Sequence, residues 1–206
     1  MRSTVASIPT RLKSLADLPI FLELSGRDPE ETTGLKGTII NCLEELVVEQ
    51  FGTDRWRRSL KLAGIDESRI YSTFEDVPDS EMHALLKAVS TAVDLPMGGV
   101  MEAFGEYWST VYAPRVYSAY YVHAKNSRDL LLRLDEIHTV MTKSIKSARP
   151  PHFRYEWRGD KHLIMHYDSA RGLVALMAGL VRGVGKYYGE YLNVSIVDNA
   201  VHIKFP

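Results

Sequence analysis

The spacing of apolar residues changes near residue 150, and this change limits the folds open to the chain more than any other feature. Before Arg149-Pro150-Pro151, apolar residues recur every three or four positions, which is typical of amphipathic helices. After it, residues 153–157 and 162–167 flank the turn Arg158-Gly159-Asp160 and alternate as a β-hairpin would. We therefore expect helices in the first part of the chain and an antiparallel sheet in the second.

Local signals place the individual elements. The apolar series that begins at Ile39 predicts a first helix, and Asp79 fits the N-cap of a later one. Further helices are expected from near Asp54, after Leu95-Pro96, around residues 117–121, over 130–141 and over 173–188, and a second hairpin over 192–197 and 201–205. The sequence thus predicts an α+β fold, with an N-terminal helical subdomain and a C-terminal subdomain of antiparallel sheet and helices.

The composition fits one globular domain and excludes several classes of partner. The 206 residues are 45% hydrophobic and 25% charged, and the net charge of -1 offers no basic field for nucleic acid or an anionic membrane. The single cysteine, Cys42, cannot form an internal disulfide, so we expect a reducing, cytoplasmic setting. No stretch resembles a signal peptide or approaches the roughly 18 consecutive apolar residues of a membrane span.

Residues 1–34 differ from the rest of the chain. Basic residues alternate there with short apolar pairs, and the run 26–34, rich in Gly, Asp, Glu and Thr, is typical of a linker. A short docking helix over 15–22 is an alternative, although Pro19 interrupts its pattern. We therefore divide the chain into an extension or linker at 1–34, which need not be ordered, and a domain at 35–206.

His138 is the first candidate functional residue. It lies on the apolar stripe of its expected helix, three or four positions from Leu134 and Met141, so its imidazole should point into the core. Position alone favours a neutral core histidine that bonds to a backbone carbonyl. The alternative is an axial ligand of haem iron, because a neutral imidazole in an apolar pocket binds that iron well.

A second candidate group follows the first hairpin. Tyr167, Ser169 and Arg171 alternate, so in an extended segment their side chains face the same way. Two hydroxyls and a planar guanidinium at one place would bind carboxylates. The alternative interpretation is a solvated loop.

Six short segments connect these two groups to a known family. They are Lys36-Gly37-Thr38-Ile39, Phe104-Gly105-Glu106-Tyr107-Trp108, Asp135-Glu136-Ile137-His138, Thr142-Lys143, Arg149-Pro150-Pro151 and the spaced triplet Tyr167, Ser169 and Arg171. With them, the chain from Lys36 onward resembles the H-NOX family, the haem nitric oxide/oxygen-binding domains related to the sensor domain of soluble guanylate cyclase. The resemblance implies a b-type haem (protoporphyrin IX iron).

The resemblance also implies roles for particular residues. His138 would be the proximal iron ligand, and Tyr167, Ser169 and Arg171 would clamp the haem propionates. Pro151 would press on the porphyrin and bend it. The residues implied to line the distal pocket and the porphyrin face are Ile39, Leu43, Trp108, Leu176 and Leu180.

Leu176 carries the expectation about gas selectivity. Oxygen-binding members of the family have at this position a tyrosine that donates a hydrogen bond to oxygen, and leucine has no donor. Nitric oxide needs such a donor far less, so the pocket is expected to select nitric oxide over oxygen. Tyr112, one turn after Trp108, would undermine this if its hydroxyl turned inward.

The expected function is therefore a bacterial gas sensor without catalysis of its own. Nitric oxide, and as a further ligand carbon monoxide, would bind opposite His138 and weaken the iron-histidine bond, and output in trans would reach a histidine kinase or a cyclic-di-GMP enzyme. An oxygen sensor and a haem-free protein-interaction module are the alternatives. The other histidines, at positions 83, 123, 152, 162, 166 and 202, lack metal-ligand spacing and are expected to be surface or packing residues.

Family members that stand alone begin near the Lys36-Gly37-Thr38 stretch, so residues 1–34 depart from the family pattern. Two explanations stay open. Translation could start at Leu35, or the segment could be a real extension that binds a partner.

Overall fold

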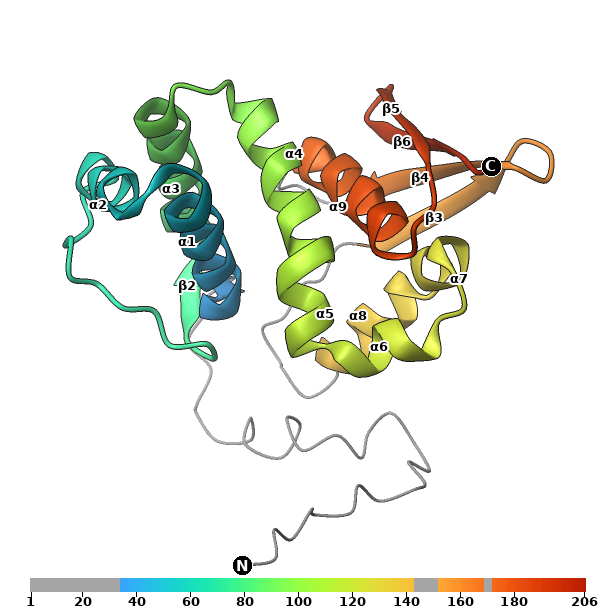
Figure 1. Cartoon of the computed structure of the whole chain (residues 1–206), viewed down its shortest axis with the longest axis horizontal. Helices are drawn as coiled ribbons and strands as arrows, with labels where there is room; N and C mark the ends of the chain where they lie inside the picture. The colour runs from blue at the N-terminus through green and yellow to red at the C-terminus, as the bar shows by residue number, and fades with distance from the viewer. Residues whose placement is uncertain (1–33, 143–151, 169–171) are drawn as a thin grey trace, which may run out of the picture.

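The computed structural model describes residues 34–142, 152–168 and 172–206. Its elements in chain order are β1 (Gly34–Lys36), α1 (Gly37–Phe51), α2 (Thr53–Leu62), β2 (Asp76–Pro78), α3 (Asp79–Val93), α4 (Met97–Tyr107), η3 (Trp108–Tyr112), α5 (Ala113–Val116), α6 (Ser118–His123), α7 (Ser127–Leu132), α8 (Leu134–Thr142), β3 (His152–Trp157), β4 (His162–Asp168), α9 (Val174–Tyr187), β5 (Asn193–Val197) and β6 (Ala200–Lys204). Helices α1 to α3 lie on one side, the sheet on the other, and α4 with α9 between them (Figure 1). The predicted α+β fold is confirmed.

The first hydrophobic core lies among α1 to α4. On α1 the buried residues Ile40, Leu43 and Val47 are spaced by three or four positions, so they share one face of the helix. They belong to one cluster with Leu85 of α3 and Phe104 of α4. The amphipathic series read from the sequence therefore buries the face that its spacing predicts.

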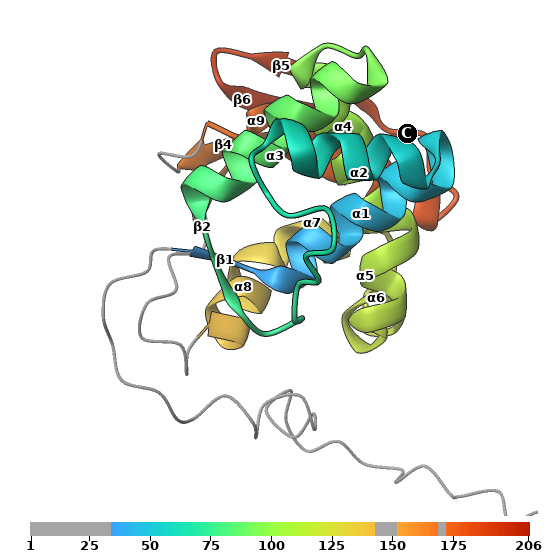
Figure 2. The same ribbon diagram turned by 90° about the vertical axis from the view of Figure 1, so that its left-hand side faces the viewer.

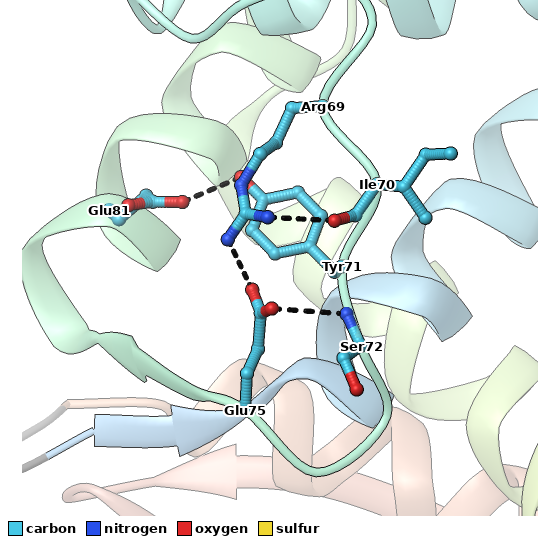
Figure 3. A network of polar contacts seen from close by, with 6 residues as sticks. All are labelled: Arg69, Ile70, Tyr71, Ser72, Glu75 and Glu81. Atoms are coloured by element: carbon cyan, nitrogen blue, oxygen red, sulfur yellow. Dashed lines mark hydrogen bonds and ion pairs between the residues drawn. The ribbon is translucent and has the colours of Figure 1, made fainter.

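The loop between α2 and β2 holds the start of α1 (Figure 3). The Tyr71 hydroxyl donates to Glu81 of α3 at 2.6 Å, and the Arg69 guanidinium lies 4.5 Å from the centre of the Tyr71 ring and pairs with Glu75. Through its Oε2, Glu75 also accepts from the backbone nitrogen of Ser72 at 3.1 Å. These contacts fold the loop tightly.

The folded loop supplies acceptors for the first turn of α1, where backbone N–H groups lack partners within the helix. Gly37 donates to the Glu75 carbonyl at 2.9 Å, and Thr38 donates to the Thr73 carbonyl at 3.1 Å. The short β1–β2 ladder lies beside this turn (Figure 2). This ladder was not predicted from the sequence, because each strand has only three residues.

The helical region continues from α4 through η3, a π-helix in which Ala113 donates its backbone N–H to Trp108, five residues earlier. The apolar stripe at 130–141, expected as one helix, is instead divided at Arg133 into α7 and α8. The side chain of Asn126 caps the start of α7, and Arg133 donates back to Leu130 over only three residues, so the helix tightens and ends there.

The C-terminal sheet has the strand order β3-β4-β6-β5, and all its pairs are antiparallel. Both predicted hairpins are therefore confirmed. On one face of the sheet, Leu163 and Met165 of β4 join Val201 and Ile203 of β6. Helix α9 packs in the same cluster and completes the second hydrophobic core.

Helices α4 and α9 join the two cores through glycines. A Cβ atom placed on Gly105 of α4 would lie 2.2 Å from the Leu176 carbonyl oxygen, and one on Gly179 of α9 would lie 2.1 Å from the Glu102 carbonyl oxygen. The two backbones thus pack as closely as residues without a side chain allow. An ion pair between Arg182 and Glu102, at 2.6 Å, fixes the same joint.

Among the described residues, no single helix is long and apolar enough to cross a membrane. Helix α3 and the stretch Met97–Val116 pass that test of length and composition only as a pair bent by 105°.

Candidate functional site

His138 lies on α8, next to the sheet. Its side chain is half-buried with the Nδ1 atom enclosed, and its ring centre lies 5.6 Å from that of Phe153 on β3. One turn earlier on α8, Asp135 accepts a hydrogen bond from the Phe153 backbone nitrogen at 3.3 Å, and the Nδ1 atom of His152 lies 3.4 Å from the same carboxylate oxygen. The helix that carries His138 is thereby tied to the first strand of the sheet.

Tyr167 lies on β4, directly opposite Phe153 in the antiparallel register. The two ring centres are 6.3 Å apart, so Phe153 has the His138 ring as one neighbour and the Tyr167 ring as another. Two predicted site residues, His138 on α8 and Tyr167 on β4, thus lie beside the same residue of β3. The other residues predicted for this part of the site, Pro151, Ser169 and Arg171, lie outside the described residues.

Most residues predicted to line the distal pocket gather at the first core. Leu43 is fully buried in it, and Ile39 and Leu176 pack against it with part of their surface exposed. Trp108 packs against both cores and so marks where they meet. Leu180, one turn beyond Leu176 on α9, is half-buried and belongs to neither cluster of described residues.

A pair of buried hydroxyls lies at the same core. The Tyr112 hydroxyl is 3.0 Å from the Thr38 hydroxyl, and either can be the donor. Tyr112 also stacks on Trp108, with ring centres 5.3 Å apart. The sequence singles out Tyr112, and it includes Thr38 only as part of a family segment; their contact could not be predicted, because the two residues are 74 positions apart.

Other histidines contact polar groups away from His138. Those of α3 and α6, His83 and His123, face backbone carbonyls four residues back. On the sheet, His162 and His202 place ring nitrogens 3.2 Å apart across β4 and β6, a contact that sequence spacing did not reveal. Within the described ranges no three His, Cys, Asp or Glu residues are arranged to hold a metal ion. Cys42 is buried in the first core, and burial raises the pKa of its thiol.

Most of the chain matches a known family of proteins. Residues 36–196 match the profile of the family described as Haem-NO-binding, which covers more than half of the chain. A curated relative, the soluble guanylate cyclase gcy-32 of Caenorhabditis elegans, is 26% identical over 155 residues. The match covers 73% of this chain but only 22% of the relative, so the chain spans less than a quarter of that protein's length.

Solved structures show the same fold. An oxygen-binding H-NOX domain related to soluble guanylate cyclases, solved as its oxygen complex, is 26% identical, with a TM-score of 0.71 over 83% of this chain and 95% of that one. An H-NOX protein from S. oneidensis in the Fe(II)NO ligation state has a TM-score of 0.75 over 84% of this chain and 99% of that one. At 22% identity, the second comparison supports the fold alone.

Proposed function

This chain belongs to the haem-NO-binding (H-NOX) family, and on that premise we propose that it senses nitric oxide with a ferrous haem b held by His138. We further propose that it has no catalysis of its own and signals in trans to a histidine kinase or a cyclic-di-GMP enzyme in a bacterial cytoplasm. Because it covers so little of the guanylate cyclases it matches, their catalytic activity is not assigned to it.

The observation that carries the proposal is the position of His138. Its imidazole is half-buried beside Phe153, on a helix that Asp135 fastens to β3. Within the described ranges no three His, Cys, Asp or Glu residues are arranged to hold a metal ion by themselves, so a metal held by His138 would have to bring further ligands with it, as haem iron does.

The surrounding side chains also fit a flat, largely apolar group. Phe153 and Tyr167 supply aromatic faces on the His138 side. Leu43, Trp108 and Leu176 supply apolar surface on the side of the first core. The proposal further assigns the propionates to Tyr167 together with Ser169 and Arg171, because hydroxyls and a guanidinium bind carboxylates well.

When bound, the haem supplies a ferrous iron at which a diatomic gas can bind. His138 would hold it as a neutral imidazole, through one ring nitrogen. Asp135, one turn before His138 on α8, accepts a hydrogen bond from the backbone nitrogen of Phe153, so the helix that would hold the haem is connected to β3. Helix α8, with its connection to β3, would be the element whose position differs between the gas-free and gas-bound states.

The proposed preference for nitric oxide rests on Leu176. This residue packs against the first core, as Trp108 also does, and offers no hydrogen to a bound gas. Oxygen depends on such a donor more than nitric oxide does, so an apolar side chain at this position favours nitric oxide.

Absorption spectra of the purified protein test the proposal. With haem supplied, the ferrous protein should show a Soret band that shifts on addition of nitric oxide or carbon monoxide and stays unchanged in air. The absence of any Soret band would refute the proposal and favour the alternative function, a haem-free protein-interaction module.

An oxygen sensor is the second candidate, because the Tyr112 hydroxyl lies at the same core as Leu176. A stable complex in air-saturated buffer would favour it over the nitric oxide sensor.

A further inference from the structure

The Thr38–Tyr112 hydroxyl pair joins two parts of the first core that are far apart in the sequence. Thr38 is the second residue of α1, and Tyr112 is the last residue of the π-helix that extends α4. Only 6% of Thr38 and 5% of Tyr112 is exposed, and their hydroxyls are 3.0 Å apart. A buried hydrogen bond of this kind is costly to break, because either hydroxyl would be left without a partner.

The ring of Tyr112 is held from two directions. The Trp108 ring stacks on it at an interplanar angle of 22°, and the Arg115 guanidinium lies 5.2 Å from its centre. The π-helix adds one residue to this turn, and such bulges are frequent at functional sites. These contacts leave the hydroxyl little freedom beyond the choice of its hydrogen-bond partner.

Thr38 is fixed just as firmly. Its backbone nitrogen donates to the Thr73 carbonyl in the loop that caps α1. Burial raises the pKa of Tyr117, and hydrogen bonding by Thr38 opposes that rise.

We propose that Thr38 sets the gas selectivity of the distal pocket by holding the Tyr112 hydroxyl in a hydrogen bond and so withholding it from the gas. The inference rests on the proposed haem-based function and adds a residue to it. A phenol has one hydrogen to donate, so while Thr38 accepts it, that hydrogen is not offered to oxygen. Leu176, at the same core, has no hydrogen to donate to oxygen in place of the Tyr112 hydroxyl.

Four variants test the inference. Thr38→Val keeps the shape of the side chain but removes its hydroxyl, whereas Thr38→Ser keeps the hydroxyl. Tyr112→Phe removes the proposed donor, and the Thr38→Val, Tyr112→Phe double variant shows whether any gain depends on it. Thr38→Ala serves if the valine variant does not fold.

The expected result is a gain in oxygen binding confined to variants that lack the Thr38 hydroxyl and keep Tyr112. Thr38→Val should raise the oxygen affinity of the ferrous protein by about tenfold or more, the effect of one hydrogen bond to a charged acceptor. Thr38→Ser, Tyr112→Phe and the double variant should stay at the wild-type value, and nitric oxide binding should change little in all of them.

A measurement on the haem-free protein tests the hydrogen bond itself. In a double-mutant cycle of urea unfolding, the losses caused by Thr38→Val and Tyr112→Phe should not add, because each variant breaks the same bond. Additive losses would overturn the inference.

The gas measurements can overturn it in three further ways. These are unchanged oxygen affinity in a haem-loaded Thr38→Val protein, a gain that persists in the double variant, and a wild-type oxygen complex that Tyr112→Phe abolishes. Each of these leaves haem binding intact. A wild-type protein that binds no haem would remove the proposed function itself, which is a distinguishable result.

Discussion

A methyl group at Gly179 should separate α4 from α9 and destabilise the whole domain. In Gly179→Ala the new Cβ would lie 2.1 Å from the Glu102 carbonyl oxygen, whereas real Cβ atoms essentially never come within 3.0 Å of another heavy atom. The obstacle is backbone, which cannot rotate aside as a side chain would. The two helices must therefore move apart by roughly 1 Å, and overpacking of this kind costs about 1–3 kcal/mol or more.

The displacement should also reach the proposed gas pocket, because Trp108 follows α4 directly and Leu176 lies on α9. Urea unfolding should give a lower free energy of unfolding, and the melting temperature should fall by roughly 2–4 °C for each kcal/mol lost. In the haem-loaded protein, the Soret band should shift or weaken.

Gly99→Ala is the matched control on α4. A Cβ at Gly99 meets nothing within 4 Å, and the residue lies inside a helix. Alanine there should stabilise the protein by about 0.5–1 kcal/mol, because glycine is a poor helix former. If Gly179→Ala unfolded at the same urea concentration as the wild type, the inference that the α4 and α9 backbones are in contact at Gly179 would be wrong.

Three further predictions follow from the site and the sheet. His138→Gly should lose haem during purification and regain it when free imidazole is supplied, as measured by Soret absorbance per protein, whereas His123→Gly should keep it; full retention in His138→Gly would contradict the ligand assignment. Leu176→Tyr should raise oxygen affinity by about tenfold to a hundredfold, since a hydrogen bond to a charged acceptor contributes about 1.5–3 kcal/mol, with little change for nitric oxide; unchanged oxygen affinity would mean that residue 176 does not face the gas. Burial, His202 and Lys204 lower the pKa of His162 in the folded protein, so the folded state takes up a proton less readily than the unfolded state, and stability falls as pH falls below the unfolded pKa of about 6.5. His162→Gln should therefore flatten the decline in the free energy of unfolding between pH 7 and pH 5. An unchanged slope would refute the lowered pKa.

Features that depend on residues close together in the sequence could be predicted from it. The change from helical spacing to alternation near Arg149-Pro150-Pro151 was enough for the α+β fold, because periodicity reports which face of a helix or strand is buried. The same reasoning placed His138 on an apolar stripe and Tyr167 in an extended segment. Its limit is visible at Arg133, where an unbroken stripe is divided by the tight turn that ends α7.

The roles assigned to His138 and Tyr167 came from the family resemblance and stay predictions. Their neighbours, in contrast, were supplied by the structure: Phe153 lies beside both rings, and Asp135 fastens the helix of His138 to β3. A sequence pattern alone cannot reveal such neighbours, because they lie on other elements.

Only the tertiary structure decided which distant residues meet. Thr38 and Tyr112 are separated by 74 residues, and their hydrogen bond exists because the loop before β2 fixes the start of α1 while a π-helix turns Tyr112 toward it. The contact between Gly105 and Gly179 likewise depends on how α4 and α9 pack. The sequence by itself determined the longer helices and the four-stranded sheet, with their buried faces, since these follow from local spacing. The contacts between elements were decided by the packing of the whole chain, since each depends on several segments being in place together.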